Sequence, residues 1–131
     1  MKECVFCNLG KVRIITENRY CICIPDKYPV TVGHSLVIPK RHFSNFFEIK
    51  KEEYQDVKEL LEKRRKNLLI KDKNIDGFNI GVNIGHSAGQ TVDHCHIHLI
   101  PRRTGDIKDP TGGVRGVIPA KRIYSLESGK K

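Results

Sequence analysis

Three histidines alternate with apolar residues in the segment DHCHIHLIP, which spans residues 93–101. Side chains two apart in a β-strand share a face and lie about 6.5–7 Å apart. The segment therefore predicts a strand with a row of histidines on one face and Cys95, Ile97 and Leu99 on the core face. A metal–imidazole bond is only about 2.0–2.1 Å long, so one ion does not suit all three. The row favours divided roles over a shared metal or a solvated face; it consists of His94, His96 and His98.

The rest of the chain predicts an α+β fold with a largely antiparallel sheet and one long helix. Residues 11–16, 20–24 and 35–39 have the β-branched and apolar composition of strands. Residues 51–69 repeat apolar side chains such as Tyr54, Val57, Leu61 and Leu68 at helical spacing, and residues 71–76 are expected to end this helix. A chain of 131 residues has the length of one domain, so we expect a single domain over residues 1–131, with a Gly/Pro-rich tail at 102–131.

Residues 77–85 (GFNIGVNIG) alternate between bulky and small side chains. In a strand, Phe78, Ile80, Val82 and Ile84 would point to the core. The opposite face would carry only glycines and the amides Asn79 and Asn83, so a ligand could approach the backbone closely there.

The formal net charge of +9 attracts phosphate-bearing partners. Part of this charge is expected to lie on a solvated face of the helix, namely Lys58, Lys63, Arg64, Arg65 and Lys66. No apolar run is long enough to span a membrane, and no export signal is evident at the N-terminus. The odd number of five cysteines favours a reducing, cytoplasmic location.

Cys4 and Cys7 form a C-x-x-C pair, which supplies half of a four-ligand zinc site. A redox role needs a βαβ context that the sequence lacks, whereas two packed core cysteines are a plain alternative. His42 and one end of the histidine row are the best candidates for the other two ligands. Cys21, Cys23 and Cys95 are interpreted as small core side chains.

The run GQTVDHCHIHLIPR at residues 89–102 resembles the signature of the histidine triad (HIT) superfamily. VGHSLVIPK at 32–40 resembles another family segment, and CVFC at 4–7 with KRHF at 40–43 resembles the zinc-bearing members. The similarity extends from Cys4 to about Pro119. It implies a homodimer that binds nucleotides and cleaves them at the α-phosphate, as do dinucleoside polyphosphate hydrolases of the Fhit and Hint type.

The resemblance also implies roles for individual residues. His96 would be the nucleophile, His98 would contact the phosphate and tune His96, and His34 would lie across the site. Asn83 would orient the site, and Gln90 and Thr91 would contact the phosphate and the leaving group. Asp26 would bind the ribose and Ile24 would stack on the base. Residues 1–10 would form a zinc-binding N-terminus, and the structural zinc ligands would be Cys4, Cys7, His42 and His94.

The implied chemistry needs no catalytic metal. An imidazole with a pKa near 6.5 is largely unprotonated at pH 7, so it can attack phosphorus and form a nucleotidyl-histidine that water then hydrolyses. His34, His98, Thr91 and backbone N–H groups of the 85–91 turn would stabilise the developing charge.

The substrate would be a purine mononucleotide derivative or a dinucleoside polyphosphate. The ending Pro101-Arg102 and the tail at 112–119 favour dinucleoside polyphosphates such as diadenosine tetraphosphate. Nucleoside phosphoramidates or acyl-adenylates are the alternative, followed by a nucleotidyltransferase or phosphorylase and by a nucleotide-binding regulator with little turnover. Action on nucleic-acid ends is disfavoured, because no DNA-binding module accompanies the motif.

Overall fold

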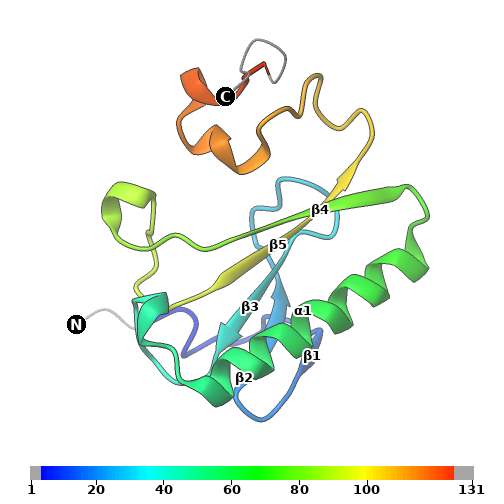
Figure 1. The fold of residues 1–131 in the computed structure, drawn as a ribbon. Coiled ribbons are helices and arrows are strands. Elements are labelled where there is room, and N and C mark those ends of the chain that lie inside the picture. The colour runs from blue at the N-terminus through cyan, green and yellow to red at the C-terminus, as the bar shows by residue number, and fades with distance from the viewer. Residues whose placement is uncertain (1–3, 126–131) are drawn as a thin grey trace.

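The computed structural model describes residues 4–125, in which a five-stranded sheet packs against one long helix (Figure 1). The strands are β1 (Thr16–Glu17), β2 (Cys21–Pro25), β3 (Ser35–Pro39), β4 (Ile75–Gly81) and β5 (Ile97–Arg103), and the helix is α1 (Lys51–Lys71). The sheet order is β1-β2-β3-β5-β4, and every neighbouring pair is antiparallel. The predicted α+β class is confirmed. No helix among the described residues is long and apolar enough to cross a membrane.

The strand expected at residues 11–16 is wrong except for its last residue. β1 pairs with β2 only at Thr16↔Cys23 and Glu17↔Ile22. Continuing the ladder would place Ile14 opposite Pro25, which has no N–H to donate and so ends the pairing. Val12 and Ile14 accordingly remain 44% and 42% exposed.

The two strands nearest the histidines are also shorter than expected. β4 begins at Ile75, inside the segment expected as loop, and ends at Gly81, which pairs with His98. Ile80 is 52% exposed, so the apolar face of this segment is not wholly core. β5 starts only at Ile97, because the Cys95 N–H leaves the ladder and donates to the Phe43 carbonyl at 2.7 Å. Of the three histidines, only His98 lies in a regular strand.

The helix α1 packs on one face of the sheet, and the N-terminal segment packs on the other. The face toward α1 carries a cluster made of Cys21, Cys23, Val37, Phe43, Val57, Leu60, Cys95 and Ile97, which confirms that the three cysteines are core residues. The opposite face carries a second cluster of Ile22, Ile24, Leu36 and Ile38, against which Phe6 and Leu9 of the N-terminal segment pack.

At the start of α1, the backbone N–H of Lys50 donates a hydrogen bond to the Glu53 carboxylate. The same carboxylate accepts two hydrogen bonds from the Arg41 guanidinium, at 2.8 and 2.9 Å. Two predictions for its faces are wrong. Tyr54 is 55% exposed although it fits the apolar periodicity, and Arg64 is only 6% exposed although it was expected on the solvated face.

The segment before β3 is held close to α1 by a glycine. Gly33 has φ +97°, and a Cβ there would lie 2.9 Å from the side chain of Leu68 and 3.1 Å from that of Pro101. No other residue type fits this backbone conformation and this spacing easily. Gly33 thereby fixes the position of the next residue, His34.

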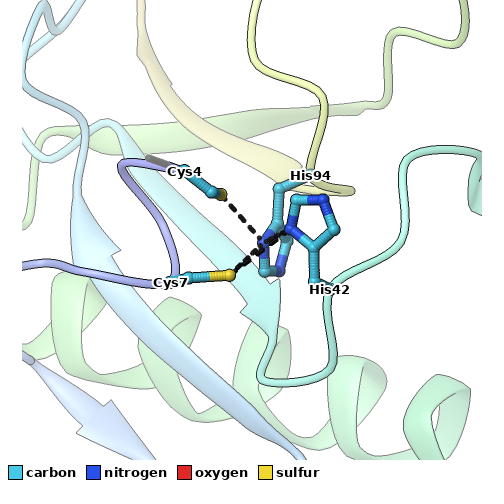
Figure 2. Close-up of side chains that lie close together, drawn as sticks. All are labelled: Cys4, Cys7, His42 and His94. Atoms are coloured by element: carbon cyan, nitrogen blue, oxygen red, sulfur yellow. Dashed lines mark hydrogen bonds between the residues drawn. The ribbon is translucent and has the colours of Figure 1, made fainter. Parts of the chain in front are cut away.

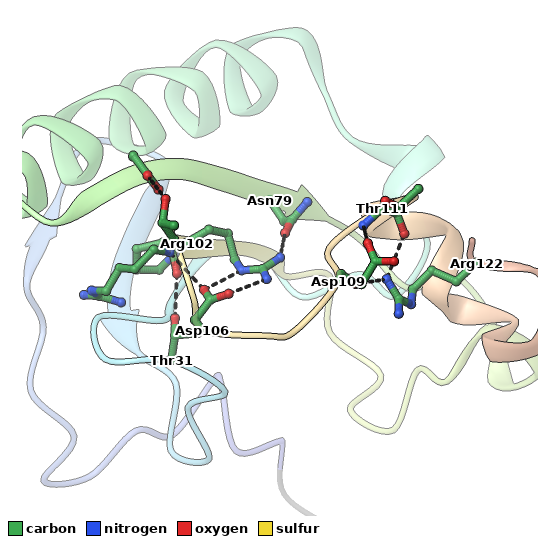
Figure 3. Close-up of polar contacts among 11 residues, drawn as sticks. Thr31, Asn79, Arg102, Asp106, Asp109, Thr111 and Arg122 are labelled. Atoms are coloured by element: carbon green, nitrogen blue, oxygen red, sulfur yellow. Dashed lines mark hydrogen bonds and ion pairs between the residues drawn. The ribbon is translucent and has the colours of Figure 1, made fainter. Parts of the chain in front are cut away.

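The C-terminal segment folds beyond β4, where two arginines hold it (Figure 3). Arg102 of β5 donates to Asn79 of β4 at 2.7 Å and forms an ion pair with Asp106 at 2.7 Å. Arg122 donates to the carbonyls of Asp109 and Thr111 at 2.6 and 2.8 Å. The segment contains the short 3₁₀ helices η3 (Gly113–Val117) and η4 (Pro119–Lys121); two others, η1 (Phe46–Glu48) and η2 (His86–Ala88), lie elsewhere.

Candidate active site

His96 is held in one tautomer by the backbone. Its Nδ1 lies 2.9 Å from the carbonyl oxygen of His94. A carbonyl only accepts, so Nδ1 carries the proton and Nε2 keeps a free lone pair. The side chain is 9% exposed, and the ring of Phe6 packs edge-on against it at 5.0 Å between centroids. The result is a buried imidazole whose Nε2 carries the lone pair that a nucleophile requires.

His34 and His98 form a second hydrogen-bonded unit. The Val30 N–H donates to Nδ1 of His34 at 3.1 Å, so the His34 proton is on Nε2. That Nε2 lies 2.9 Å from Nδ1 of His98 and 3.2 Å from the Asp26 carboxylate. Because Nδ1 of His98 accepts, its own proton is on Nε2, which leaves His98 as a hydrogen-bond donor.

Burial keeps this unit uncharged at neutral pH. Burial first, and then the neighbouring His96 and His34, lower the pKa of His98 to about 4, against the opposite effect of Asp26. Burial also lowers the pKa of His34, again against the effect of Asp26.

Asp26, His34 and His98 have the residue types of a metal site. The Val30 hydrogen bond argues against that use, because a metal on Nε2 of His34 would have to displace its only proton. The geometry is that of a hydrogen-bonded array.

A cavity of about 260 Å³ opens beside this array. Asn83, His34 and His98 line it together with Val114 of the tail. Gly81, which pairs with His98, leaves open space where a Cβ would stand. The structure thus brings Asn83 into one cavity with His34 and His98, and its role in orienting the site stays a prediction.

The 85–91 turn is stabilised by hydrogen bonds of the Gln90 side chain and of its own backbone. Gln90 is 4% exposed; its Oε1 accepts from the Gly85 N–H at 2.9 Å, and its Nε2 donates to the carbonyls of Ser44 and Val92. The N–H groups of Ala88, Gly89 and Gln90 bond within the turn. Gln90 therefore holds the turn, and its contact with a phosphate stays a prediction. Thr91 is exposed, and its contact with a ligand also stays a prediction.

Two of the predicted nucleotide-binding residues, Ile24 and Asp26, lie on the His98 side of the sheet. Ile24 pairs with Leu36, which pairs with His98 in the next strand. Ile24 is only 4% exposed, in the cluster against which Phe6 and Leu9 pack, so its stacking on a base stays a prediction. Asp26 receives the Tyr28 N–H at 2.7 Å on one oxygen and faces His34 with the other, so its ribose contact also stays a prediction.

Sequence reasoning missed two residues that position the histidines. Val30 sets the His34 tautomer through its backbone, which no side-chain pattern reveals. Phe6 packs on His96, and its place between Cys4 and Cys7 was the available signal, because the cysteines fix that turn.

Cys4, Cys7, His42 and His94 converge on one point from three separate segments (Figure 2). Nδ1 of His94 lies 3.3 Å from Cys4 Sγ, 3.5 Å from Cys7 Sγ and 3.2 Å from His42 Nδ1. Ligands about 2.0–2.3 Å from a tetrahedral zinc lie roughly 3.3–3.8 Å from one another, so the donors fit that ion. Nε2 of His94 donates to the Pro39 carbonyl at 2.7 Å, which leaves Nδ1 free to bind metal.

Comparison with known proteins agrees with this geometry. The HIT domain model matches residues 10–105. The chain belongs to the HIT family. It is 38% identical over 110 residues to an uncharacterised HIT-like protein of Saccharolobus solfataricus, covering 79% of this chain and 76% of that protein.

Two curated relatives are named for an activity. An adenylylsulfatase of Arabidopsis thaliana is 36% identical, with coverage of 79% of this chain and 54% of that protein. An adenosine 5′-monophosphoramidase of Saccharomyces cerevisiae is 35% identical, with coverage of 76% and 63%. A zinc-bound histidine triad family protein from Mycobacterium smegmatis has a similar structure, with a TM-score of 0.73, 31% identity and coverage of 96% of both chains. Together with its histidine site, these relationships make the chain a HIT-type hydrolase.

Proposed function

We propose that the chain cleaves nucleotides at the α-phosphate through a covalent nucleotidyl-His96 intermediate. The observation that carries the proposal is the hydrogen bond from His96 Nδ1 to the His94 carbonyl, which leaves the lone pair of the neutral ring on Nε2. In this tautomer Nε2 can attack phosphorus without a further base.

The reaction divides into two displacements. In the first, Nε2 of His96 forms a bond to the α-phosphorus while the bond from phosphorus to the leaving group breaks. The N–H of His98 stabilises the charge that develops on the phosphate oxygens or the leaving group. In the second, water attacks the phosphorus, the phosphorus–nitrogen bond breaks, and the nucleoside monophosphate leaves with His96 restored.

We propose adenylyl compounds with a small leaving group, such as a phosphoramidate or adenylylsulfate, as the first substrates to test. The two relatives named for an activity support this choice. Arg102, one of the residues that favoured dinucleoside polyphosphates, is engaged by Asn79 and Asp106. Dinucleoside polyphosphates therefore become the alternative.

The Cys/His cluster is proposed to hold a structural zinc. Four protein ligands leave no open position for substrate, so the ion would stabilise the fold and take no part in the reaction. It would connect the N-terminal turn, the segment after β3 and the segment before β5.

A homodimer is proposed across the outer edge of β4. β4 is the last strand of the described sheet, and Ile80 on it is 52% exposed. Val114, Val117 and Ile118 of the neighbouring tail are 61%, 78% and 59% exposed. A free strand edge beside apolar side chains suits pairing with a second copy.

A substrate panel tests the proposed function. Adenosine phosphoramidate, adenylylsulfate, diadenosine tetraphosphate and adenylated DNA are each assayed for release of AMP. We expect turnover of the first two and little action on the DNA. Binding of AMP without turnover of any substrate would contradict the hydrolase proposal and favour a regulatory nucleotide-binding protein.

A further inference from the structure

Arg64 is a buried cation in the middle of α1. Its side chain is 6% exposed, and its Nε donates to the Ser35 hydroxyl at 2.9 Å. Ser35 in turn donates to the Gly33 carbonyl at 2.8 Å. A guanidinium has five N–H donors, so this contact uses only one of them.

The remaining donors of Arg64 meet no acceptor in the part of the chain that the structure describes. Within residues 4–125, no carboxylate lies within ion-pair distance of Arg64, and its one side-chain hydrogen bond is the bond to Ser35. Over the same residues, no fully buried side-chain nitrogen lacks a partner, so the terminal nitrogens must open onto a cavity. Burial lowers the pKa of Arg64, and the charge of Arg13 adds to this effect. An unpaired buried charge of this kind is costly unless a ligand compensates it.

A cavity of about 470 Å³ lies against Arg64, between the second half of α1 and the segment that leads into β3. Its cationic lining residues are Arg13, Arg64, Lys71 and Arg103. The lining also includes two carboxylates: Asp72 forms an ion pair with Arg103 at 3.0 Å, and Asp26 lies 3.2 Å from Nε2 of His34. Arg13, Arg64 and Lys71 therefore leave an excess of positive charge. Pro25, Pro29, Val32 and Leu68 supply apolar walls.

We propose that this cavity binds a tetrahedral oxyanion, a phosphate or sulfate group, on the guanidinium of Arg64, with Arg13 and Lys71 at its mouth. The planar fork of an arginine matches two oxygens of such a group. The guanidinium lies on the other side of the sheet from the histidines: Ser35 points to the α1 face, whereas Leu36 and His98 point to the opposite face. His34 lines both cavities, and Asp26, the predicted ribose contact, lines this one, so the two sites share a wall.

The test is a titration with inorganic phosphate at constant ionic strength, followed by amide chemical shifts. We compare the wild type, Arg64→Met, which keeps the apolar stem, and Lys66→Met. Lys66→Met removes the same charge from an exposed position of the same helix. Saturable shifts at Gly33, Ser35 and Leu68 are expected in the wild type and in Lys66→Met. Arg64→Met should weaken phosphate binding about 10- to 100-fold, the value of a lost charged hydrogen bond.

Two results would overturn the proposal: equal affinity in Arg64→Met, or shifts confined to residues 85–91 and the histidines. If Arg64→Met does not fold, exposed Arg13→Met serves instead and should weaken binding roughly two- to fivefold; an unchanged affinity there contradicts the site. Phenyl phosphate distinguishes the source of the oxyanion. Tighter binding than inorganic phosphate would indicate a phosphate ester that uses the apolar wall, and equal binding would indicate the free ion.

Discussion

The backbone carbonyl of His94 accepts a hydrogen bond from His96 Nδ1 at 2.9 Å, while the His94 side chain lies among Cys4, Cys7 and His42. One residue therefore contributes to both the proposed zinc cluster and the orientation of the proposed nucleophile. The Cys95 N–H, which donates to Phe43, holds the same backbone independently of any metal. The cluster should consequently affect stability more than chemistry.

Removing one thiol of the cluster tests this. Cys7→Ser should lose bound zinc and lower the free energy of unfolding by several kcal/mol, because a structural ion contributes its binding energy to the fold. Activity per folded molecule should stay within about tenfold, since no catalytic group is removed. Metal analysis and chemical denaturation measure the two effects. Cys23→Ala, a cysteine outside the cluster, should keep its zinc. Far less than one zinc per wild-type chain would contradict the assignment.

Acid should destabilise the protein through the buried histidines. The pKa of His98 is lowered to about 4, whereas an unfolded histidine titrates near 6.5. Between these values the unfolded chain binds a proton that the folded chain does not. The free energy of unfolding should therefore have its full value above pH 6.5 and decrease as the pH falls toward 4. His98 alone should lower it by up to about 1.4 kcal/mol per pH unit in this range. His34 should add to the loss in the same direction.

The chain has no tryptophan, so urea unfolding at several pH values is best followed by far-UV circular dichroism. His98→Asn removes the titrating group and should give a shallower dependence of stability on pH. A slope equal to that of the wild type would show that His98 is not the group responsible.

The parts of this molecule that depend on local pattern were predictable from its sequence. The helix, β2 and β3 follow from periodicity and composition, and the triad motif indicates the family. The ends of β1 and β5 were not predictable, because they depend on what lies across the ladder: Pro25 ends one pairing and the Phe43 carbonyl diverts the other. Arg64 was misplaced for a similar reason. Its position depends on Ser35, which is distant in sequence and whose hydroxyl accepts its hydrogen bond while donating to the Gly33 carbonyl.

The proposed dimer makes a prediction about size. Light scattering should give about 30 kDa, twice the chain mass of 15.0 kDa. Ile80→Asp would bury a charge in the β4 edge and should produce monomers at micromolar concentration. Val12→Asp adds the same charge at a residue with similar exposure beside the opposite edge, and should leave the dimer intact. A monomeric wild type, or equal effects of the two variants, would remove the β4 edge as the interface.

The last prediction concerns the nucleophile. His96→Asn should reduce turnover by several orders of magnitude, because the covalent route needs the lone pair of Nε2. His34→Asn and His98→Asn should cost less, on the order of 10- to 1,000-fold, as expected for loss of one donor or of the residue that orients it. Nucleotide affinity should survive in His96→Asn if the predicted contacts of Asp26 and Asn83 dominate binding.

The decisive measurement uses substrate labelled at the α-phosphate and a quench in base, where a phosphorus–nitrogen bond to histidine persists. Label should remain on the wild type and be absent from His96→Asn. Equal labelling of both proteins would exclude His96 as the attacking group, whatever the effect on rate.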